Sequence, residues 1–265
     1  MKKFAAILLT VGLSSALLCG CGKETKTEQS LTLPPAALTA AVSDATTQAA
    51  TQPVTLDAEG KVAPSWFDDA VFVGDSITTT LDYLCGEDPG LLGNAQFVCA
   101  DSLSYHNAQW DLNDENAVHP QYRGETVLAE RAAELTGASK MFILMGINDV
   151  DTYGVEDTMD SLKEFVRKIL THSPNVQLYF QSTTPMITDL ETDILNNEII
   201  REFDGQLQAY CNENGYHYID LYHQMCDDTG ALRDDYCVDP DADGVHFTDE
   251  ACIIWANYLK TAVAG

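Results

Sequence analysis

Residues Phe72–Thr78 read FVGDSIT, and this stretch joins an apolar run to a polar segment with helical spacing. Such a junction predicts a buried strand that ends near Gly74 and a helix that begins near Ser76. A serine at the start of a helix often caps it, because its hydroxyl accepts a hydrogen bond from a free backbone N–H. The same position also exposes the hydroxyl to a ligand. The rest of the chain decides whether Ser76 is a cap or a nucleophile.

Short apolar runs alternate with helical patterns along the chain. Most of the runs are continuously apolar, which is typical of strands that are covered on both faces. This alternation predicts an α/β fold, a three-layer α/β/α sandwich with a five-stranded, mainly parallel sheet. The five predicted strands are Ala70–Val73, Gln96–Ala100, Met141–Met145, Val176–Phe180 and Tyr216–Leu221.

Two segments between the predicted strands carry apolar residues every three or four positions, which indicates helices that cover the sheet. A third helix is predicted over Ala251–Val263, with Thr248 as its N-cap and two acidic residues in its first turn. The first two apolar stripes are Met159, Leu162, Phe165, Val166 and Ile169, and Ile199, Phe203, Leu207 and Tyr210.

Polar residues that suit acyl transfer follow the ends of the predicted strands. Ser76 follows the first strand, Ser102 the second and Asn148 the third, and the loop after the fifth contains Asp243 and His246. Ligands of parallel sheets bind beyond the carboxyl ends of the strands, so we expect these side chains to converge there. A histidine can take the proton of a serine, a carboxylate can orient the histidine, and N–H groups can stabilise an oxyanion.

Three of these segments resemble signature blocks of the GDSL/SGNH hydrolases. GDS at Gly74–Ser76, GIND at Gly146–Asp149 and DGVH at Asp243–His246 look like the first, third and fifth blocks, in the family's order. The resemblance covers about 64–265. It implies a flavodoxin-like fold and a serine esterase or acyl-esterase that needs no cofactor and no metal.

The resemblance also implies a role for each matching residue. Ser76 corresponds to the nucleophile, His246 to the general base and Asp243 to the acid that orients it. The Ser76 N–H and the Asn148 side chain correspond to oxyanion donors. The family's second block supplies a further donor from a glycine, but here residues 100–108 read ADSLSYHNA, and Ser102 is the best match.

The remaining five histidines, His106 among them, are interpreted as structural or surface residues. None of them stands three residues after an acid in the loop that follows the last predicted strand.

The loop that contains His246 also matches a calcium-binding pattern. Asp239–Glu250, DPDADGVHFTDE, fits D-x-[DN]-x-[DN]-G-x5-E. However, His246 stands where such loops carry an aliphatic residue, Pro240 stiffens the start, and no amphipathic helix precedes the loop. We therefore interpret the loop as catalytic, with a weak incidental ion site as the open alternative.

Residues 1–21 resemble the signal of a bacterial lipoprotein. Lys2 and Lys3 precede an apolar stretch that is too short to span a bilayer comfortably, and residues 18–21, LCGC, resemble a lipobox. Cys21 is then the lipidated residue, and an ordinary cleaved signal is the alternative. The chain is expected to be exported and anchored by its lipid alone at the extracytoplasmic face of the cell membrane.

Residues 22–63 are rich in Thr, Ala, Gln, Pro and Ser, and are predicted to be a disordered tether before one domain at 64–265.

Six cysteines remain after residue 21. An even number in an exported chain permits disulfides, and Cys226 with Cys237 is the first candidate pair because they bracket one loop. Cys99, in an apolar strand, is interpreted as a free thiol.

The chain has 14 basic and 41 acidic residues and a formal net charge of −27. This charge repels nucleic acid and anionic lipid, so neither is an expected partner.

The expected partner is a small or polymeric ester. O-acetylated envelope glycans are preferred because of the expected location of the protein, and lipid esters come second. Two alternatives stay open: a degenerate domain that binds carbohydrate without turnover, which the missing second-block glycine supports, and an O-acyltransferase that uses the same residues.

Overall fold

The structure, a computed structural model, describes residues 55–114 and 116–264. The predicted lipoprotein signal with Cys21 and residues 22–54 of the predicted tether lie outside the described residues. Within the described ranges, no helix combines the length and the apolar composition needed to cross a membrane.

The folded domain begins before Pro64, which corrects the predicted boundary. Leu56 and Val62 form an antiparallel bridge, and Val62 is only 2% exposed. The Val62 N–H donates to Lys260 O over 2.9 Å. One buried valine therefore attaches this polar segment to the domain. A single apolar residue does not change the polar composition of the segment, so the sequence does not reveal the attachment.

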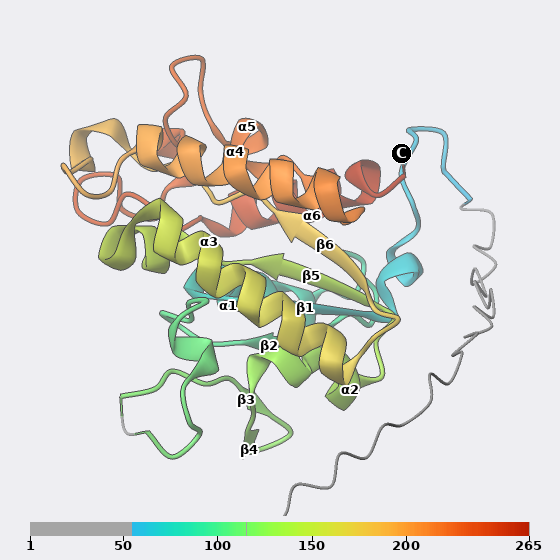
Figure 1. The fold of residues 1–265 in the computed structure, drawn as a ribbon. Helices are drawn as coiled ribbons and strands as arrows, with labels where there is room; N and C mark the ends of the chain where they lie inside the picture. Colours follow the sequence, from blue (N-terminus) through green and yellow to red (C-terminus); the bar gives the residue numbers. More distant parts are fainter. Residues whose placement is uncertain (1–54, 115, 265) are drawn as a thin grey trace, which may run out of the picture. The chain divides into compact units, whose positions relative to one another are not determined.

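Five parallel strands form the central sheet, which confirms the predicted fold class (Figure 1). Their order is β2-β1-β5-β6-β7, and every neighbouring pair is parallel. Each predicted apolar run overlaps one strand, and the ends differ by at most two residues. The strands are β1 (Ala70–Gly74), β2 (Gln96–Cys99), β5 (Lys140–Leu144), β6 (Gln177–Gln181) and β7 (His217–Ile219).

The strand order reverses at β1. The chain passes from β1 to β2 on one side and then returns to β5 on the other side of β1. In sheets of this kind the crevice beyond the carboxyl ends of the strands at the reversal is the usual ligand site. Here that crevice lies after Gly74 at the end of β1 and after Leu144 at the end of β5.

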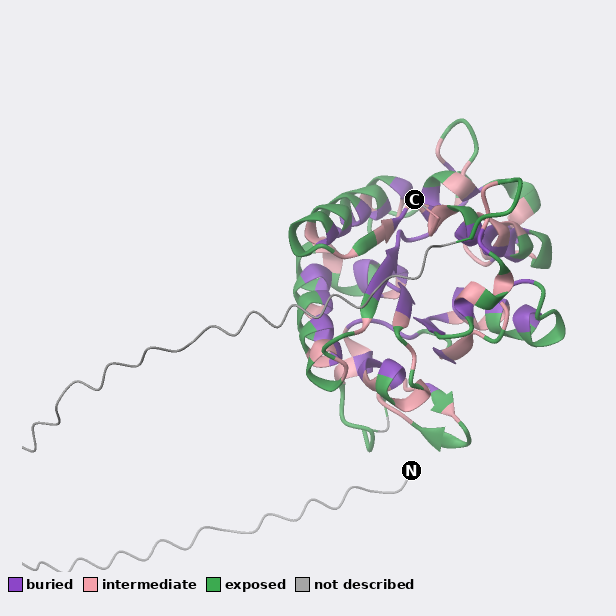
Figure 2. Cartoon of the chain, turned by 90° about the vertical axis from the view of Figure 1, so that its right-hand side faces the viewer, coloured by how far each residue is buried: buried purple, intermediate pink, exposed green. Residues whose placement is uncertain are grey.

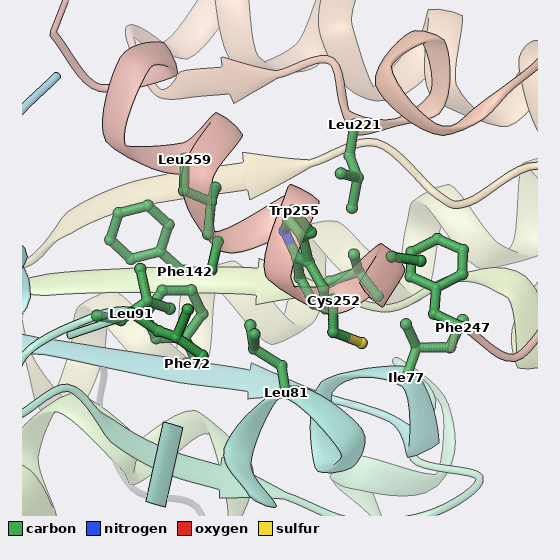
Figure 3. Close-up of a cluster of buried hydrophobic side chains, with 14 of the residues drawn as sticks. Phe72, Ile77, Leu81, Leu91, Phe142, Leu221, Phe247, Cys252, Trp255 and Leu259 are labelled. Atoms are coloured by element: carbon green, nitrogen blue, oxygen red, sulfur yellow. The ribbon is translucent and has the colours of Figure 1, made fainter. Parts of the chain in front are cut away.

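Helices cover both faces of the sheet, and alternate strand residues point to opposite faces. Phe72 and Phe142 belong to one buried cluster with side chains of α1, α5 and α6 (Figure 3). Val71 and Ile143 belong to a second cluster with side chains of α2, α3 and α4. Figure 2 shows buried residues along the strands and the inner sides of the helices. The helices are α1 (Ser76–Glu87), α2 (Ala132–Thr136), α3 (Ile147–His172), α4 (Asn197–Asn214), α5 (Leu221–Met225) and α6 (Asp249–Ala262).

The three helices predicted from apolar spacing are α3, α4 and α6. All five residues of the first predicted stripe are buried on α3. On α4, Phe203 and Leu207 are buried, whereas Ile199 and Tyr210 are partly buried. Thr248 caps α6 as predicted, since its hydroxyl accepts from Ala251 N over 3.3 Å.

Short elements complete the connections between strands and helices. Their apolar content is too small to give a periodic signal, and the sequence pattern does not predict them. They are a hairpin of β3 (Gln121–Tyr122) and β4 (Glu125–Thr126), and five 3₁₀ turns at Pro64–Phe67, Asn107–Gln109, Ala129–Arg131, Thr188–Leu190 and Asp234–Tyr236.

The six described cysteines are all free thiols. Cys226 and Cys237, the first candidate pair for a disulfide, are therefore not bonded to each other. Their backbones pair with other residues in isolated antiparallel β-bridges, Cys226 with Leu232 and Cys237 with Phe247. Burial raises the pKa of the Cys99 thiol to about 12, so it stays protonated at neutral pH. The structure therefore agrees with the interpretation of Cys99 as a free thiol.

Candidate active site

Ser76 lies at the tight junction between β1 and α1, directly beyond the carboxyl end of β1. A Cβ atom at Gly74 would lie 2.6 Å from Leu144 O and even closer to the Thr78 side chain, so only glycine fits there. The N-cap of α1 is Asp75, whose carboxylate accepts from Ile77 N over 3.1 Å. Ser76 is the first helical residue and not the N-cap, which leaves its hydroxyl available for other contacts.

His246 and Asp243 reach Ser76 from the loop before α6. Ser76 Oγ lies 2.8 Å from His246 Nε2, and His246 Nδ1 lies 2.6 Å from Asp243 Oδ1. An ionised carboxylate can only accept, so Nδ1 carries the proton and Nε2 is left to accept from the serine hydroxyl. The three predicted catalytic residues thus form one continuous hydrogen-bonded chain.

Asp243 is held as a carboxylate by its own loop. Burial opposes the charge, but hydrogen bonds from the His246 N–H, the His246 ring and the Val245 N–H outweigh it and lower the pKa of Asp243. Gly244, with φ +79°, makes the turn between Asp243 and Val245. Because both oxygens of Asp243 serve residues of this loop, its geometry suits the orientation of His246 better than calcium binding. Among the described residues, no group of three or more His, Cys, Asp or Glu side chains is placed to hold a metal ion.

Asn148, a predicted oxyanion donor, lies in the first turn of α3 beside residue 75. Its Nδ2 donates to Asp75 Oδ2 and to Leu103 O, each over 3.3 Å. Gly146 precedes it with φ +131°, and a Cβ atom there would lie 2.6 Å from the Phe203 ring, so glycine is required for this turn. Burial raises the pKa of Asp75 to about 7. The amide of Asn148 therefore faces the Asp75–Ser76 junction through long contacts that a bound oxyanion could replace.

Ser102, the other predicted donor, has a left-handed backbone with φ 61°. Glycine adopts this conformation freely, whereas other residues rarely do. The glycine that the family resemblance implies at this position would adopt the conformation without strain. Within residues 55–114 and 116–264, the Ser102 N–H donates no hydrogen bond, so it is available to a ligand.

Asp149 and His106 form a contact that the sequence does not predict. The buried Asp149 carboxylate accepts from Tyr105 N over 2.9 Å and from His106 N over 3.0 Å, and its Oδ1 lies 2.9 Å from His106 Nδ1. The His106 ring stacks on Tyr153, with 3.7 Å between the ring centroids. These contacts fasten the segment after Ser102 to the first turn of α3, which carries Asn148. These contacts are compatible with the interpretation of His106 as a structural or surface residue, and its place beside the site has no signal in the sequence.

Two cavities flank Ser76 and Asn148. The serine cavity, of about 430 Å³, is lined by Ser76, Thr79, Thr80, Tyr83, Asp101 and His246. The amide cavity, of about 260 Å³, lies on the side of the predicted oxyanion donors. Its lining includes Ser102, Asn107, Trp110, Asn148, Thr152 and Tyr153. A ligand with its ester carbon at Ser76 therefore has space on both sides.

Comparisons with known proteins identify a family and a shared fold. The family model described as the GDSL-like lipase/acylhydrolase family matches residues 72–251. A solved GDSL-like lipase from Bacteroides thetaiotaomicron is similar to this chain with a TM-score of 0.55 and 18% identity. The match covers 74% of this chain and 88% of the lipase chain. A lipase/acylhydrolase from Enterococcus faecalis is similar to this chain with a TM-score of 0.51 and 16% identity, and the match covers 74% of this chain and 95% of the acylhydrolase chain. No curated protein matches the chain. At these identities the solved structures show that the fold is shared.

Proposed function

Because the chain belongs to the GDSL-like lipase/acylhydrolase family, we propose that it is a serine esterase in which Ser76 is the nucleophile. The observation that supports this proposal is the chain of contacts from Ser76 Oγ to His246 Nε2 and from His246 Nδ1 to Asp243. A serine needs such a base to become nucleophilic near neutral pH, and the base needs a carboxylate to fix its tautomer.

The reaction follows from the same geometry. His246 accepts the hydroxyl proton as Ser76 Oγ attacks the ester carbon, and Asp243 stabilises the imidazolium that results. The carbonyl oxygen becomes negative and accepts from the Ser76 and Ser102 N–H groups and from Asn148 Nδ2. His246 then gives its proton to the leaving alcohol, and the acyl group remains on Ser76. A water molecule, activated by His246, releases the acid and restores the serine.

The decisive experiment compares residues 22–265 with the Ser76→Ala variant in the hydrolysis of p-nitrophenyl acetate. We expect the variant to lose the rate by a factor on the order of 10³ or more, because the nucleophile is absent. Ser65→Ala, an exposed serine outside the site, is the matched control and should keep the full rate. Equal rates for Ser76→Ala and the unaltered protein would overturn the serine mechanism and favour a degenerate binding domain.

We propose O-acetylated envelope glycans as the natural esters, in line with the expected export of the chain. Transfer of the acyl group to a sugar hydroxyl, instead of water, would use the same residues. Product analysis separates the two reactions, since transfer conserves the ester and hydrolysis releases one acid for each alcohol.

We also propose that Cys21 carries a lipid that anchors the protein on the extracytoplasmic face of the membrane. The support is the lipobox-like LCGC at residues 18–21. Radiolabelled palmitate should enter the full chain and not its Cys21→Ser variant, with Cys19→Ser as the control that keeps the label. Unchanged labelling of Cys21→Ser would refute the assignment.

A further inference from the structure

We propose that the amide cavity and the cavity beside it form a binding site for a neutral glycan chain, with Trp110 at the point where they meet. This inference rests on the proposed esterase function, since the glycan would present its ester to Ser76. The second cavity, here called the outer cavity, has a volume of about 390 Å³, and Trp110 lines both.

The amide cavity offers free hydrogen-bonding groups around two aromatic side chains. Trp110 and Tyr153 are 37% and 38% exposed. Within the described part of the chain, the Trp110 indole N–H and the hydroxyls of Ser102, Thr152 and Tyr153 make no hydrogen bond. A sugar ring has an apolar face of C–H groups and a rim of hydroxyls that both donate and accept. Aromatic side chains with free donors and acceptors beside them match both features.

The Tyr153 side of the cavity is preorganised. The Tyr153 ring stacks on His106, and His106 is fixed by the buried Asp149 carboxylate. Asn107 is fixed as well, because its Nδ2 donates to Ser102 O over 2.8 Å and its Oδ1 accepts from Ser104 N over 2.9 Å. A ligand therefore meets side chains that lose little conformational freedom on binding.

The charge and polarity of the amide cavity disfavour two other ligand classes in that part of the site. Asp151 is its only charged lining residue among the described residues, and neither Lys nor Arg lines it, so an anionic ligand is repelled. The lining also contains no aliphatic side chain of the size of Val, Leu or Ile. A long acyl chain would bury its methylene groups against hydroxyls and amides that need partners, which is unfavourable.

The outer cavity gives a chain of sugars a place to continue past Trp110. Glu130 lines it, is only 4% exposed, and its Oε2 has no hydrogen-bond partner within the described residues. A buried carboxylate oxygen without a partner is costly, and this oxygen has almost no exposed surface. A small movement of the Glu130 side chain on binding would let a sugar hydroxyl donate to it and remove that cost. The rest of the lining of this cavity is mixed: it is polar at Gln109 and Asn113, charged at Asp111 and Lys168, and apolar at Leu112 and Leu128. This unsatisfied oxygen favours a ligand longer than one ring.

Calorimetry on the Ser76→Ala variant of residues 22–265 tests the site without turnover. The probes are cellotetraose, xylotetraose and N-acetylated chitotetraose, with tetragalacturonate as the anionic control and the corresponding disaccharides as short ligands. We expect at least one neutral tetrasaccharide to bind more tightly than its disaccharide and than tetragalacturonate. Adding Trp110→Ala should weaken that binding by a factor of about 10 or more, and Thr152→Val by a smaller factor. Ile253→Ala, a substitution of an exposed side chain on α6, should leave it unchanged.

The outcomes separate this inference from the proposed function. If Ser76-dependent hydrolysis of p-nitrophenyl acetate is present but none of the neutral saccharides binds at millimolar concentration, the glycan site is refuted and the esterase stands. Binding that Trp110→Ala and Thr152→Val leave intact, or tighter binding of tetragalacturonate, also refutes the site. Binding that depends on Trp110 in a protein without hydrolysis refutes the esterase and supports the site.

Discussion

Ser102 has a strained backbone conformation at the position where its N–H is proposed to stabilise the oxyanion. A non-glycine residue at φ 61° costs about 1–2 kcal/mol relative to an ordinary backbone conformation. The Ser102→Gly substitution removes this strain but makes the unfolded chain more flexible, which costs about 0.4–1 kcal/mol. We therefore predict a net stabilisation of about 0–1.6 kcal/mol and an esterase rate that is equal or higher. Thermal unfolding and p-nitrophenyl acetate hydrolysis measure the two effects.

The Ser102→Ala variant is the control for the glycine substitution. Alanine also removes the hydroxyl but keeps the Cβ atom, and so it keeps the strained backbone. Its unfolding temperature should stay near that of the unaltered protein. A Ser102→Gly variant that was less stable than Ser102→Ala would show that the left-handed conformation is not strained here.

The sequence predicted the residues of the site because they follow strands. Ser76, Asn148, Asp243 and His246 stand in motifs after predicted strands, and parallel strands bring their carboxyl ends to one edge. His106 carries no such mark, because it lies 43 positions from Asp149 and touches it only in the fold. The strained φ of Ser102 also has no signature in composition or spacing.

At the level of elements, Asp149 joins the first turn of α3 to the loop that carries Ser102. Its two oxygens accept from two backbone N–H groups and lie beside the His106 ring nitrogen. In Asp149→Asn an amide NH₂ would face one of these donors, so the loop should shift. Loss of one oxyanion donor costs up to about 10²–10³ in kcat, and we predict a fall of about 10-fold to 100-fold in kcat with a smaller change in KM.

Asp157→Asn provides the comparison on the same helix, because that side chain is exposed. It should keep both kcat and KM. His106→Phe retains an aromatic ring to stack on Tyr153 and removes only the ring nitrogens, so its kcat should fall less than that of Asp149→Asn. If Asp149→Asn changed KM alone, the carboxylate would not position an oxyanion donor.

Asp204 on α4 connects that helix to the end of β6, where it accepts from Thr183 N over 2.7 Å. Burial raises the pKa of Asp204 from 3.8 to about 7. The folded state then holds a proton that the unfolded state has lost between about pH 4 and pH 7. Stability contributed by this group is therefore lost as pH rises through that window. Asp204→Asn, which keeps an acceptor for Thr183, should show a smaller fall in unfolding temperature from pH 5 to pH 8.

Asp75 has the same sign of shift, with a pKa of about 7. It remains in the Asp204→Asn variant, so the pH dependence should be reduced and not abolished. An unfolding temperature that differs from that of the unaltered protein by the same amount at pH 5 and pH 8 would contradict the assignment to Asp204.

Strands and long helices were predictable because burial on two faces leaves continuous apolar runs, and burial on one face leaves a stripe. β1 and α3 are examples. The hairpin of β3 and β4 has two exposed or half-buried residues in each strand, so no alternation of apolar and polar residues marks it. The attachment of residues 55–63 depends on Val62 alone, and a single residue has no periodicity.

The whole molecule brings its catalytic parts together through one topological feature. The sheet order places β1 beside β5, so the glycine-led turns that carry Ser76 and Asn148 are neighbours although they lie far apart in the sequence. The segment between α5 and α6 brings His246 back to the same edge of the sheet. It leads into α6, whose side chains pack in the same buried cluster as those of α1, on the same face of the sheet. The single sheet thus explains why three distant motifs form one site.

The charge of the whole molecule gives the last prediction. Residues 22–265 have 41 acidic and 12 basic residues, because Lys2 and Lys3 precede them, and repulsion between like charges opposes the compact state. Exposed pairs such as Arg167 with Glu164 contribute little against it. The screening length falls from about 30 Å at 0.01 M salt to about 8 Å at 0.15 M, so the unfolding temperature of residues 22–265 should rise over this range. The rise should be the same in NaCl and KCl, since screening depends on ionic strength. An unfolding temperature that fell with salt would mean that attractive ion pairs outweigh the repulsion.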